Sequence, residues 1–182
     1  IFKYFGDEKY AKPISKEIIK LRKNKKIKTE NLVEIIENIK TKKSGKNNST
    51  KVFQALRIFV NKEITELING LINAYNILPV GGLIAVVTFH SIEDKIVKFF
   101  FKEYSEVKNS SRYLPQSILS KKYFNLIKKK PIIPSSNEIK INPPSRSAKL
   151  RFAYKLNNGC DFKNFFNSFK HLIDIENLNF NV

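Results

Sequence analysis

Apolar residues recur at helical spacing over the first part of the chain. Between residues 7 and 22 they follow one helical face, which only Pro13 interrupts near its start. A second helix is expected over residues 29–39, with Thr29 as its N-cap. Residues 40–51 are rich in Lys, Ser and Asn, which predicts a loop and an internal boundary.

The middle of the chain indicates an α/β fold class. Apolar residues three or four apart over residues 56–78 predict one continuous helix. After the turn at Gly81-Gly82, residues 83–89 are continuously apolar, which is typical of a strand buried on both faces in a parallel sheet. An apolar helical pattern over residues 92–100 follows this strand. Helix, turn, buried strand and helix in this order predict α/β architecture.

The last third of the chain shows weaker patterns. Residues 105–146 follow neither period and include four prolines after residue 130, so an irregular segment is expected. Alternation over residues 148–155 predicts an antiparallel or edge strand. Phenylalanines between residues 162 and 169 predict a closing helix within the tail.

Positive charge is concentrated in two segments. The chain has 34 Lys plus Arg against 16 Asp plus Glu, a formal net charge of +18. Residues 1–51 and 112–151 each carry a net +9, whereas residues 52–111 are neutral. Such a field attracts phosphate polyanions, so nucleic acid is the expected partner. The alternative is a codon bias toward lysine, since the chain has 29 Lys and only five Arg.

Composition also restricts the class of protein. Hydrophobic residues make up 42% of the chain, enough for a packed core, which excludes a disordered basic tail. No apolar run approaches the ~20 residues of a membrane span, and the charged first twenty residues do not resemble a signal peptide. Cys160 is the only cysteine, which excludes an internal disulfide and fits a reducing compartment. A cytoplasmic protein is therefore expected.

Several enzyme classes find no support in the motifs. The two histidines and one cysteine are too dispersed for a zinc site, so no metal is expected. There is no P-loop, no GxSxG elbow and no GxGxxG turn. The chain lacks methionine altogether and opens at Ile1 within a helical pattern. We therefore expect it to be the carboxyl-terminal piece of a longer protein.

A polar cluster follows the predicted buried strand, where open α/β sheets bind their ligands. It consists of His90, Ser91, Glu93 and Asp94. Ser91 is interpreted as a helix cap, with the two carboxylates in the positive first turn of the helix. His90 either meets a substrate or orients a carboxylate, or it is a structural histidine.

A second cluster covers residues 142–151, where prolines stiffen a loop that carries Ser and Arg donors. It either clamps a phosphate or folds over a ligand, or it is a basic turn that enters an edge strand. In a chain that uses lysine by default, each arginine indicates a site for bidentate pairing, although chance is the simpler explanation for two of them. The two that chance explains are Arg22 and Arg112, and the other three are Arg57, Arg146 and Arg151.

Four segments resemble one family in sequence and in order. They read GDEKYAKPI (6–14), FQALRIFVNKEI (53–64), TFHSIEDKIVK (88–98) and NPPSRSAKLR (142–151). The last two are similar to the family patterns F-H-S-L-E-D-R-I-V-K and N-P-R-S-R-S-A-K-L-R. On these residues the chain resembles the bacterial small-subunit ribosomal RNA cytosine-N4 methyltransferases, long called MraW.

The resemblance implies an S-adenosylmethionine-dependent enzyme that methylates a decoding-site cytosine of small-subunit ribosomal RNA. It implies a Rossmann-like class I methyltransferase domain with an inserted helical domain. Residues 1–45 would be the end of that insertion and residues 46–156 the carboxyl-terminal half of the catalytic domain, whereas residues 157–182 form a tail of unknown role. A flipped-out cytosine would fit the need to reach the amine.

The resemblance also assigns roles to residues. The family's cofactor-binding residues would lie upstream of Ile1, so this chain alone is expected to bind cofactor poorly and to be inactive. No residue is identified as catalytic. The candidates for the substrate pocket are His90, Ser91, Glu93 and Asp94 as walls, Asn142, Arg146 and Ser147 in a covering loop, and Arg57 as support. Two alternatives stay open, a non-catalytic basic RNA-binding module and a mitochondrial homologue.

Overall fold

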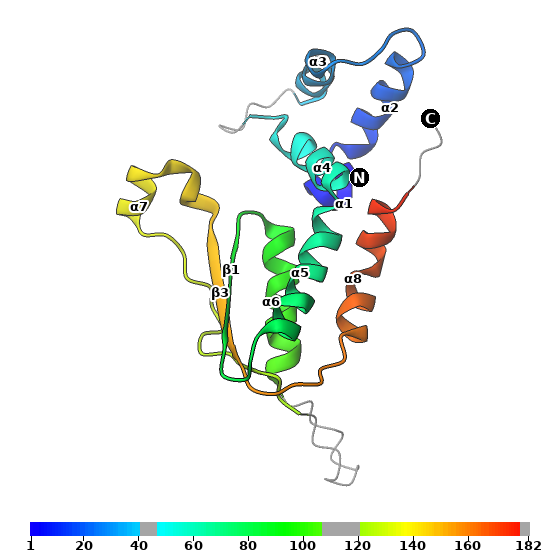
Figure 1. Cartoon of the computed structure of the whole chain (residues 1–182). Helices are drawn as coiled ribbons and strands as arrows, with labels where there is room; N and C mark the ends of the chain where they lie inside the picture. Colours follow the sequence, from blue (N-terminus) through cyan, green and yellow to red (C-terminus); the bar gives the residue numbers. More distant parts are fainter. Residues whose placement is uncertain (41–46, 107–120, 179–182) are drawn as a thin grey trace, which may run out of the picture. The chain divides into compact units, whose positions relative to one another are not determined.

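The computed structural model describes residues 1–40, 47–106 and 121–178 of the chain (Figure 1). They form a mixed α/β structure of two compact units. Unit 1 contains residues 1–63 and the chain from Leu172 onward, and unit 2 contains residues 64–171. No helix in the described ranges is both long and apolar enough to cross a bilayer. Arg112 and part of the predicted 40–51 loop lie outside the described residues.

Unit 1 is built from helices whose apolar faces meet. It holds α1 (Phe2–Gly6), α2 (Ala11–Leu21), α3 (Thr29–Ile39) and α4 (Thr50–Asn61). The helix expected over residues 7–22 is confirmed as α2, and Pro13 is tolerated because it lies in the first turn. The second helix is confirmed over residues 29–39, although its N-cap is Lys28 and not Thr29.

Two contacts hold these helices together. Ile14, Leu32, Ile36 and Val52 form a buried cluster that joins α2, α3 and α4. Helix α1 packs against α4 so closely that a Cβ on Gly6 would lie 2.4 Å from the carbonyl oxygen of Lys51. Any other residue at this position would force α1 away from α4, so glycine is required here by the packing.

The predicted continuous helix over residues 56–78 is wrong. The chain forms α4, which ends at Asn61, and a separate α5 (Glu63–Ile77). Between them Lys62 adopts a left-handed conformation with φ of 52°, which ends a helix. Val60 is 74% exposed and Ile64 is buried, although their spacing fits one helical stripe.

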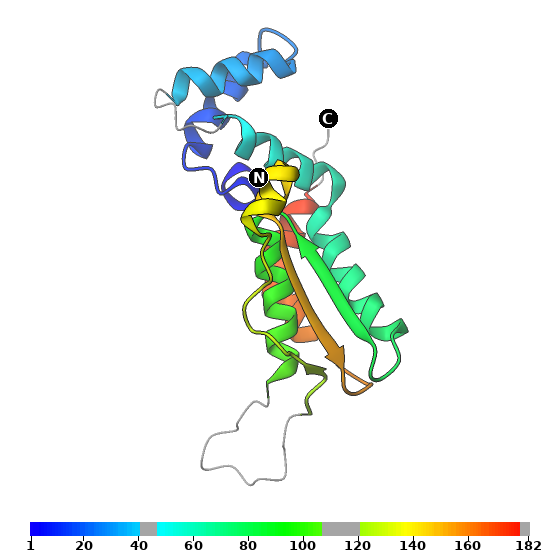
Figure 2. The ribbon, with the colours of Figure 1, turned by 90° about the vertical axis from the view of Figure 1, so that its left-hand side faces the viewer.

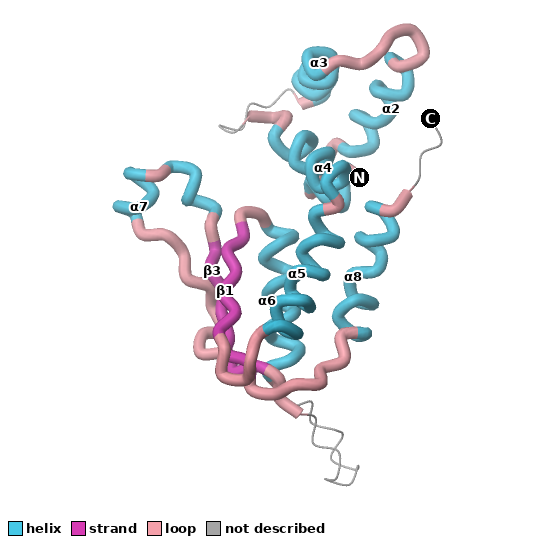
Figure 3. The backbone as a smooth tube through the Cα atoms, in the orientation of Figure 1, coloured by secondary structure: helices cyan, strands magenta, loops and turns pink. Residues whose placement is uncertain are grey.

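Unit 2 contains a small antiparallel sheet with the order β1-β3-β2 (Figures 2 and 3). The strands are β1 (Leu83–Thr88), β2 (Phe124–Asn125) and β3 (Lys149–Lys155). Strand β3 is central and pairs antiparallel with both neighbours, so its predicted antiparallel character is confirmed and its edge position is wrong. In the register with β1, Ile84 lies opposite Ala153 and Thr88 opposite Lys149.

The prediction that β1 is buried on both faces in a parallel sheet is wrong for the residues described. Exposed and buried residues alternate along β1, so that Ile84 and Thr88 are buried while Leu83 and Val87 are 46% and 52% exposed. Helix α5 and the helix that follows β1 lie on one side of the sheet, and residues 136–141 do not (Figure 3). A continuous apolar run does not reveal whether one face or both faces of a strand are covered, and this is why the prediction failed.

Aromatic side chains form much of the core of unit 2. Helix α6 (Ser91–Ser105) packs on the sheet, and α8 (Lys163–Glu176) confirms the closing helix predicted from the phenylalanines. Phe100 of α6 lies 5.0 Å from Phe165 of α8 and 5.3 Å from Phe124 of β2, measured between ring centroids. The segment predicted to be irregular contains β2, the short helix α7 (Ser136–Ile141) and the 3-10 turn η1 (Pro143–Ser147).

The division into units differs from the loop boundary expected at residues 40–51, because the compact units separate after Glu63. Within residues 157–182, α8 begins in unit 2, and the chain from Leu172 onward belongs to unit 1. The functional meaning given above to residues 1–45, 46–156 and 157–182 stays a prediction.

Candidate functional site

The candidate site begins where β1 ends and α6 starts. His90, and not Ser91, is the N-cap of α6, and its imidazole Nδ1 accepts a hydrogen bond from the backbone N–H of Glu93 at 3.4 Å. The Glu93 carboxylate in turn accepts from the backbone N–H groups of Phe89 and His90, at 2.8 and 3.3 Å. These reciprocal bonds form a capping box, and Ser91 becomes the first residue of the helix, with an exposed side chain.

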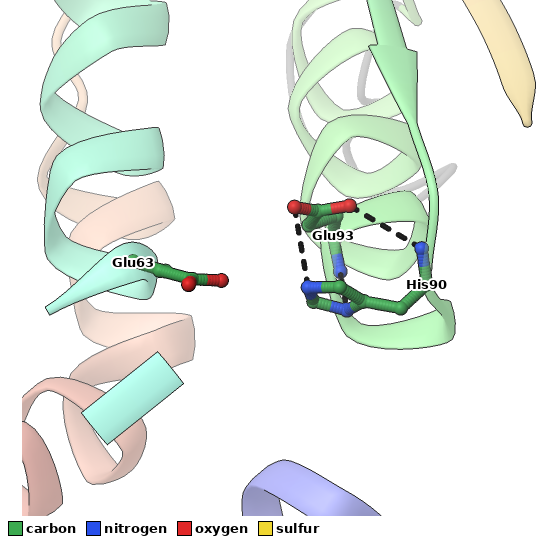
Figure 4. A group of neighbouring side chains, drawn as sticks. All are labelled: Glu63, His90 and Glu93. Carbon is green, nitrogen blue, oxygen red and sulfur yellow. Dashed lines mark hydrogen bonds and ion pairs between the residues drawn. The ribbon is translucent and has the colours of Figure 1, made fainter. Parts of the chain in front are cut away.

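His90 and Glu93 also contact each other through their side chains (Figure 4). His90 Nε2 lies 3.2 Å from Glu93 Oε1, while Nδ1 acts as an acceptor. A neutral imidazole that accepts at Nδ1 carries its proton on Nε2, so the ring N–H lies at contact distance from the carboxylate. Burial alone would raise the pKa of Glu93, but the hydrogen bonds from His90 and Phe89 outweigh it and hold the pKa below its usual range.

Asp94 links the start of α6 to β3. Its Oδ1 accepts from Arg151 Nε at 2.7 Å, and its Oδ2 accepts from Lys149 Nζ at 3.0 Å. The Asp94 and Arg151 side chains are only 13% and 9% exposed. Burial opposes ionisation of Asp94, but the bonds from Arg151 and then Lys149 lower the pKa of this carboxyl below its usual range. The negative charge also lies in the first turn of α6, where the helix dipole favours it.

A further bond extends this cluster beyond the sheet. Arg151 Nη1 donates to the backbone carbonyl of Lys129 at 3.1 Å, so the loop after β2 is fixed to the same guanidinium.

The face of β3 that points to the interior consists of Arg151, Ala153 and Lys155, which are all buried. The alternation over residues 148–155 indicates the strand, but its charged residues Arg151 and Lys155 share the interior face with Ala153.

Lys155 is a buried lysine that sequence reasoning missed. It is 2% exposed, and its Nζ donates to the carbonyl oxygens of Tyr75 and Leu78 at 2.7 Å each. The ammonium also lies 4.3 Å from the Tyr75 ring centroid. A cation at the carboxyl end of α5 satisfies carbonyls that the helix leaves open and matches the helix dipole. Its alternating position alone could not have revealed this role.

The predicted covering loop precedes β3 and ends beside the last residue of β1, because Lys149 pairs with Thr88. Ser145 is the buried residue of this loop, and the Ser145 hydroxyl donates to the backbone carbonyl of Asn142 at 2.7 Å. The side chains of Asn142, Arg146 and Ser147 are exposed. The structure therefore places the loop at the same end of the sheet as His90.

Arg57 belongs to unit 1, whereas the other candidate residues belong to unit 2. Its Nε and Nη2 donate to the two carboxylate oxygens of Glu63, at 2.7 and 3.1 Å. This bidentate pair joins α4 to the first residue of α5 across the break at Lys62. Glu63, drawn in Figure 4 with His90 and Glu93, belongs to unit 1. The expectation that arginines mark bidentate pairing is met by Arg57.

Comparison with known proteins shows the family. Residues 1–156 match the model of the MraW methylase family. The chain belongs to this family. The match to the MraW methylases ends at Leu156, directly after β3, so α8 lies outside it.

Individual MraW relatives agree with this result. The chain is 44% identical over 155 residues to the ribosomal RNA small subunit methyltransferase H of Ehrlichia chaffeensis, covering 84% of this chain and 50% of that protein. It is 44% identical over 161 residues to the protein of the same name from Rickettsia bellii, and the match covers 86% of this chain and 52% of that protein. To the protein of the same name from Xanthobacter autotrophicus it is 42% identical over 154 residues, and the match covers 84% of this chain and 45% of that protein. The chain thus spans about half the length of the curated relatives it matches.

Proposed function

We propose that this chain contributes the carboxyl-terminal half of an S-adenosylmethionine-dependent methyltransferase that acts on the N4 amine of a cytosine in small-subunit ribosomal RNA. The match of residues 1–156 to the MraW methylase family carries this proposal. The names of the relatives support the class of substrate. The net charge of +18 supports an RNA partner.

The chemistry requires positioning more than acid–base catalysis. S-adenosylmethionine, when bound, would supply the methyl group and keep the electron pair of the carbon–sulfur bond, while the amine nitrogen would gain the methyl carbon and lose a proton. Holding the nitrogen in line with the methyl group lowers the barrier, because the reacting atoms are already oriented. In our proposal His90, Ser91, Glu93 and Asp94 form walls near the target base, and Asn142, Arg146 and Ser147 belong to a loop over it.

The glycine pair of the sequence does not offer an open loop for the methyl donor. Gly81 and Gly82, the one glycine pair of the sequence, exchange backbone hydrogen bonds with Lys155 at 2.8 and 2.9 Å. They therefore close the link between α5 and β1 and do not form a loop open to a ligand. We propose that S-adenosylmethionine binds to sequence corresponding to the other half of the relatives. Rossmann-like assembly and the helical insertion over residues 1–45 belong to the same proposal.

Fragment complementation tests this function. Small ribosomal subunits lacking the modification are incubated with methyl-labelled S-adenosylmethionine and the chain, with or without the amino-terminal half of the Rickettsia bellii relative. We expect no incorporation with the chain alone and labelled N4-methylcytidine when both halves are present.

Two outcomes would contradict the proposal. An assembled pair of halves that transfers no methyl group, or that labels another nucleotide, would refute the proposed reaction. RNA binding by the chain without any complementation would favour the alternative, a non-catalytic basic RNA-binding module.

A further inference from the structure

Two cavities of similar size in unit 2 differ in their charge. One, of about 260 Å³, includes three carboxylates and two lysines, namely Glu103, Glu106, Asp161, Lys121 and Lys163. The other, of about 240 Å³, includes four cations and one carboxylate, namely Lys98, Lys102, Lys129, Arg151 and Glu106. We call the second one the basic cavity. Its volume suits one or two small chemical groups, and its charge suits an anion.

The cations of the basic cavity have different partners. Arg151 is neutralised by Asp94 at 2.7 Å, so it contributes shape more than net charge. For Lys98, Lys102 and Lys129 the described part of the chain provides no ion pair, and all three are exposed. With Glu106 as the only lining carboxylate, the cavity carries about two net positive charges. Among the residues that line the cavity, only Glu106 therefore competes with an incoming anion for these lysines.

The fold holds the three lysines around one opening. Lys98 and Lys102 are four residues apart on α6 and hence share one face of the helix. Lys129 comes from the loop after β2, and its backbone carbonyl is bonded to Arg151 Nη1 at 3.1 Å. The same guanidinium is held by Asp94, so the lysine loop and the start of α6 are fixed by one buried group. This arrangement is prepared before any ligand arrives.

The remaining lining is apolar. Phe101 is 1% exposed and Leu126 is half-buried, and both contribute to the wall of the basic cavity. A simple inorganic anion makes no use of an apolar wall, whereas a nucleotide presents a phosphate beside a sugar and a base. Lysine ammonium groups bind phosphate as point charges, without demanding one orientation.

We propose that the basic cavity binds phosphodiester groups of an RNA strand and positions the strand along α6. The idea rests on the proposed function, because it assumes that RNA is the substrate. The cavity is distinct from the His90 and Glu93 pair, but it shares Arg151 with the Asp94 cluster. It gives the strand a fixed backbone contact at a residue that is also tied to the start of α6.

The test compares two double variants of the full chain that remove the same charge. K98Q/K102Q empties the basic cavity of its α6 lysines, and K121Q/K163Q removes two lysines from the other cavity. All four side chains are exposed, so folding should be preserved and is checked by circular dichroism. Binding of a labelled RNA hairpin from the decoding region is measured by fluorescence anisotropy between 50 and 300 mM KCl.

We expect K98Q/K102Q to weaken binding about tenfold or more at low salt. Two lost phosphate contacts should reduce the slope of log K against log salt by roughly 1.4 to 1.8. K121Q/K163Q should change the slope much less, because its lysines lie among carboxylates. Equal effects of the two variants, or no effect of K98Q/K102Q, would overturn the proposal.

Competition separates the possible ligands. Unlabelled RNA should displace the labelled hairpin far better than adenosine monophosphate or poly-glutamate at equal phosphate or carboxylate concentration. Full displacement by the mononucleotide would assign the cavity to free nucleotides, and full displacement by poly-glutamate would assign it to acidic peptides, and either would overturn the proposal. No methyl donor is present in this assay, so its failure is distinct from failure of the methyl-transfer test above.

Discussion

Replacing Asp94 with asparagine should destabilise the chain strongly. The substitution keeps the shape of the side chain but removes the charge that faces Arg151 and Lys149. Breaking a buried ion pair by removing one partner costs about 3–5 kcal/mol. Because the Lys149 side chain is 41% exposed and Arg151 keeps its bond to Lys129, we expect a smaller loss of about 2–3 kcal/mol. The folded-to-unfolded ratio would fall roughly 30- to 150-fold.

The effect should depend on pH in a defined direction. The pKa of Asp94 is lowered in the folded state, whereas in the unfolded chain it is about 3.9. The unfolded state therefore binds the proton more readily, and the contribution of Asp94 is complete above about pH 4 and is lost as the pH falls through the folded pKa. The difference between wild type and Asp94→Asn should be full at pH 7 and should shrink below pH 4.

Urea unfolding followed by circular dichroism measures this difference. At a slope of about 2–3 kcal/mol per molar urea, the midpoint should fall by about 1 M at pH 7. The matched control is Asp161→Asn, since Asp161 lies 3.9 Å from Lys163 and both side chains are mostly exposed. Its midpoint should not move. An unchanged midpoint for Asp94→Asn, or a loss that persists undiminished in acid, would refute the reasoning.

Three other substitutions or modifications test single contacts. Lys155→Met leaves the carbonyl oxygens at the end of α5 without their donor and should lower the free energy of unfolding by about 2 kcal/mol, measured in urea. A variant that resists urea better than the wild type would contradict this, because burying the ammonium would then cost more free energy than its hydrogen bonds contribute. His90→Ala should cost about 1 kcal/mol by removing the cap of α6, whereas His90→Asn, which also caps, should cost far less, and equal losses would contradict the capping role. Burial raises the pKa of Cys160 to about 12, so its reaction with Ellman's reagent at pH 8 should be at least roughly tenfold slower than in urea, and equal rates would disprove its protection.

Local patterns predicted most helices and the existence of two strands. The spacing of apolar residues located α2, α3, α6 and α8, because each of these helices buries one continuous face. The same rule failed at Lys62, where a residue without glycine's freedom adopts a left-handed conformation. No residue type in that segment indicates the end of a helix, and the apolar spacing continues across the break by coincidence.

The candidate site was predicted in position but not in its bonds. His90, Glu93 and Asp94 follow the strand as expected, yet the assignment of the cap to Ser91 was wrong because the His90 imidazole occupies that role. The partners of Asp94 come from residues 149 and 151, more than fifty positions away. Such pairing depends on the register between β1 and β3, and no local pattern specifies a register.

The lysines of this chain divide into two groups by what they bind. Lys149 and Lys155 are engaged by a carboxylate and by helix carbonyls, so their charge is needed for the fold. Lys98 and Lys102 are exposed around a cavity with a single carboxylate, so the fold has little use for their charge. A codon bias toward lysine would place residues in both groups at random, but it does not explain why three of them converge on one cavity with an apolar wall. Comparing K98Q/K102Q with K121Q/K163Q therefore measures whether the excess charge of the chain is functional or incidental.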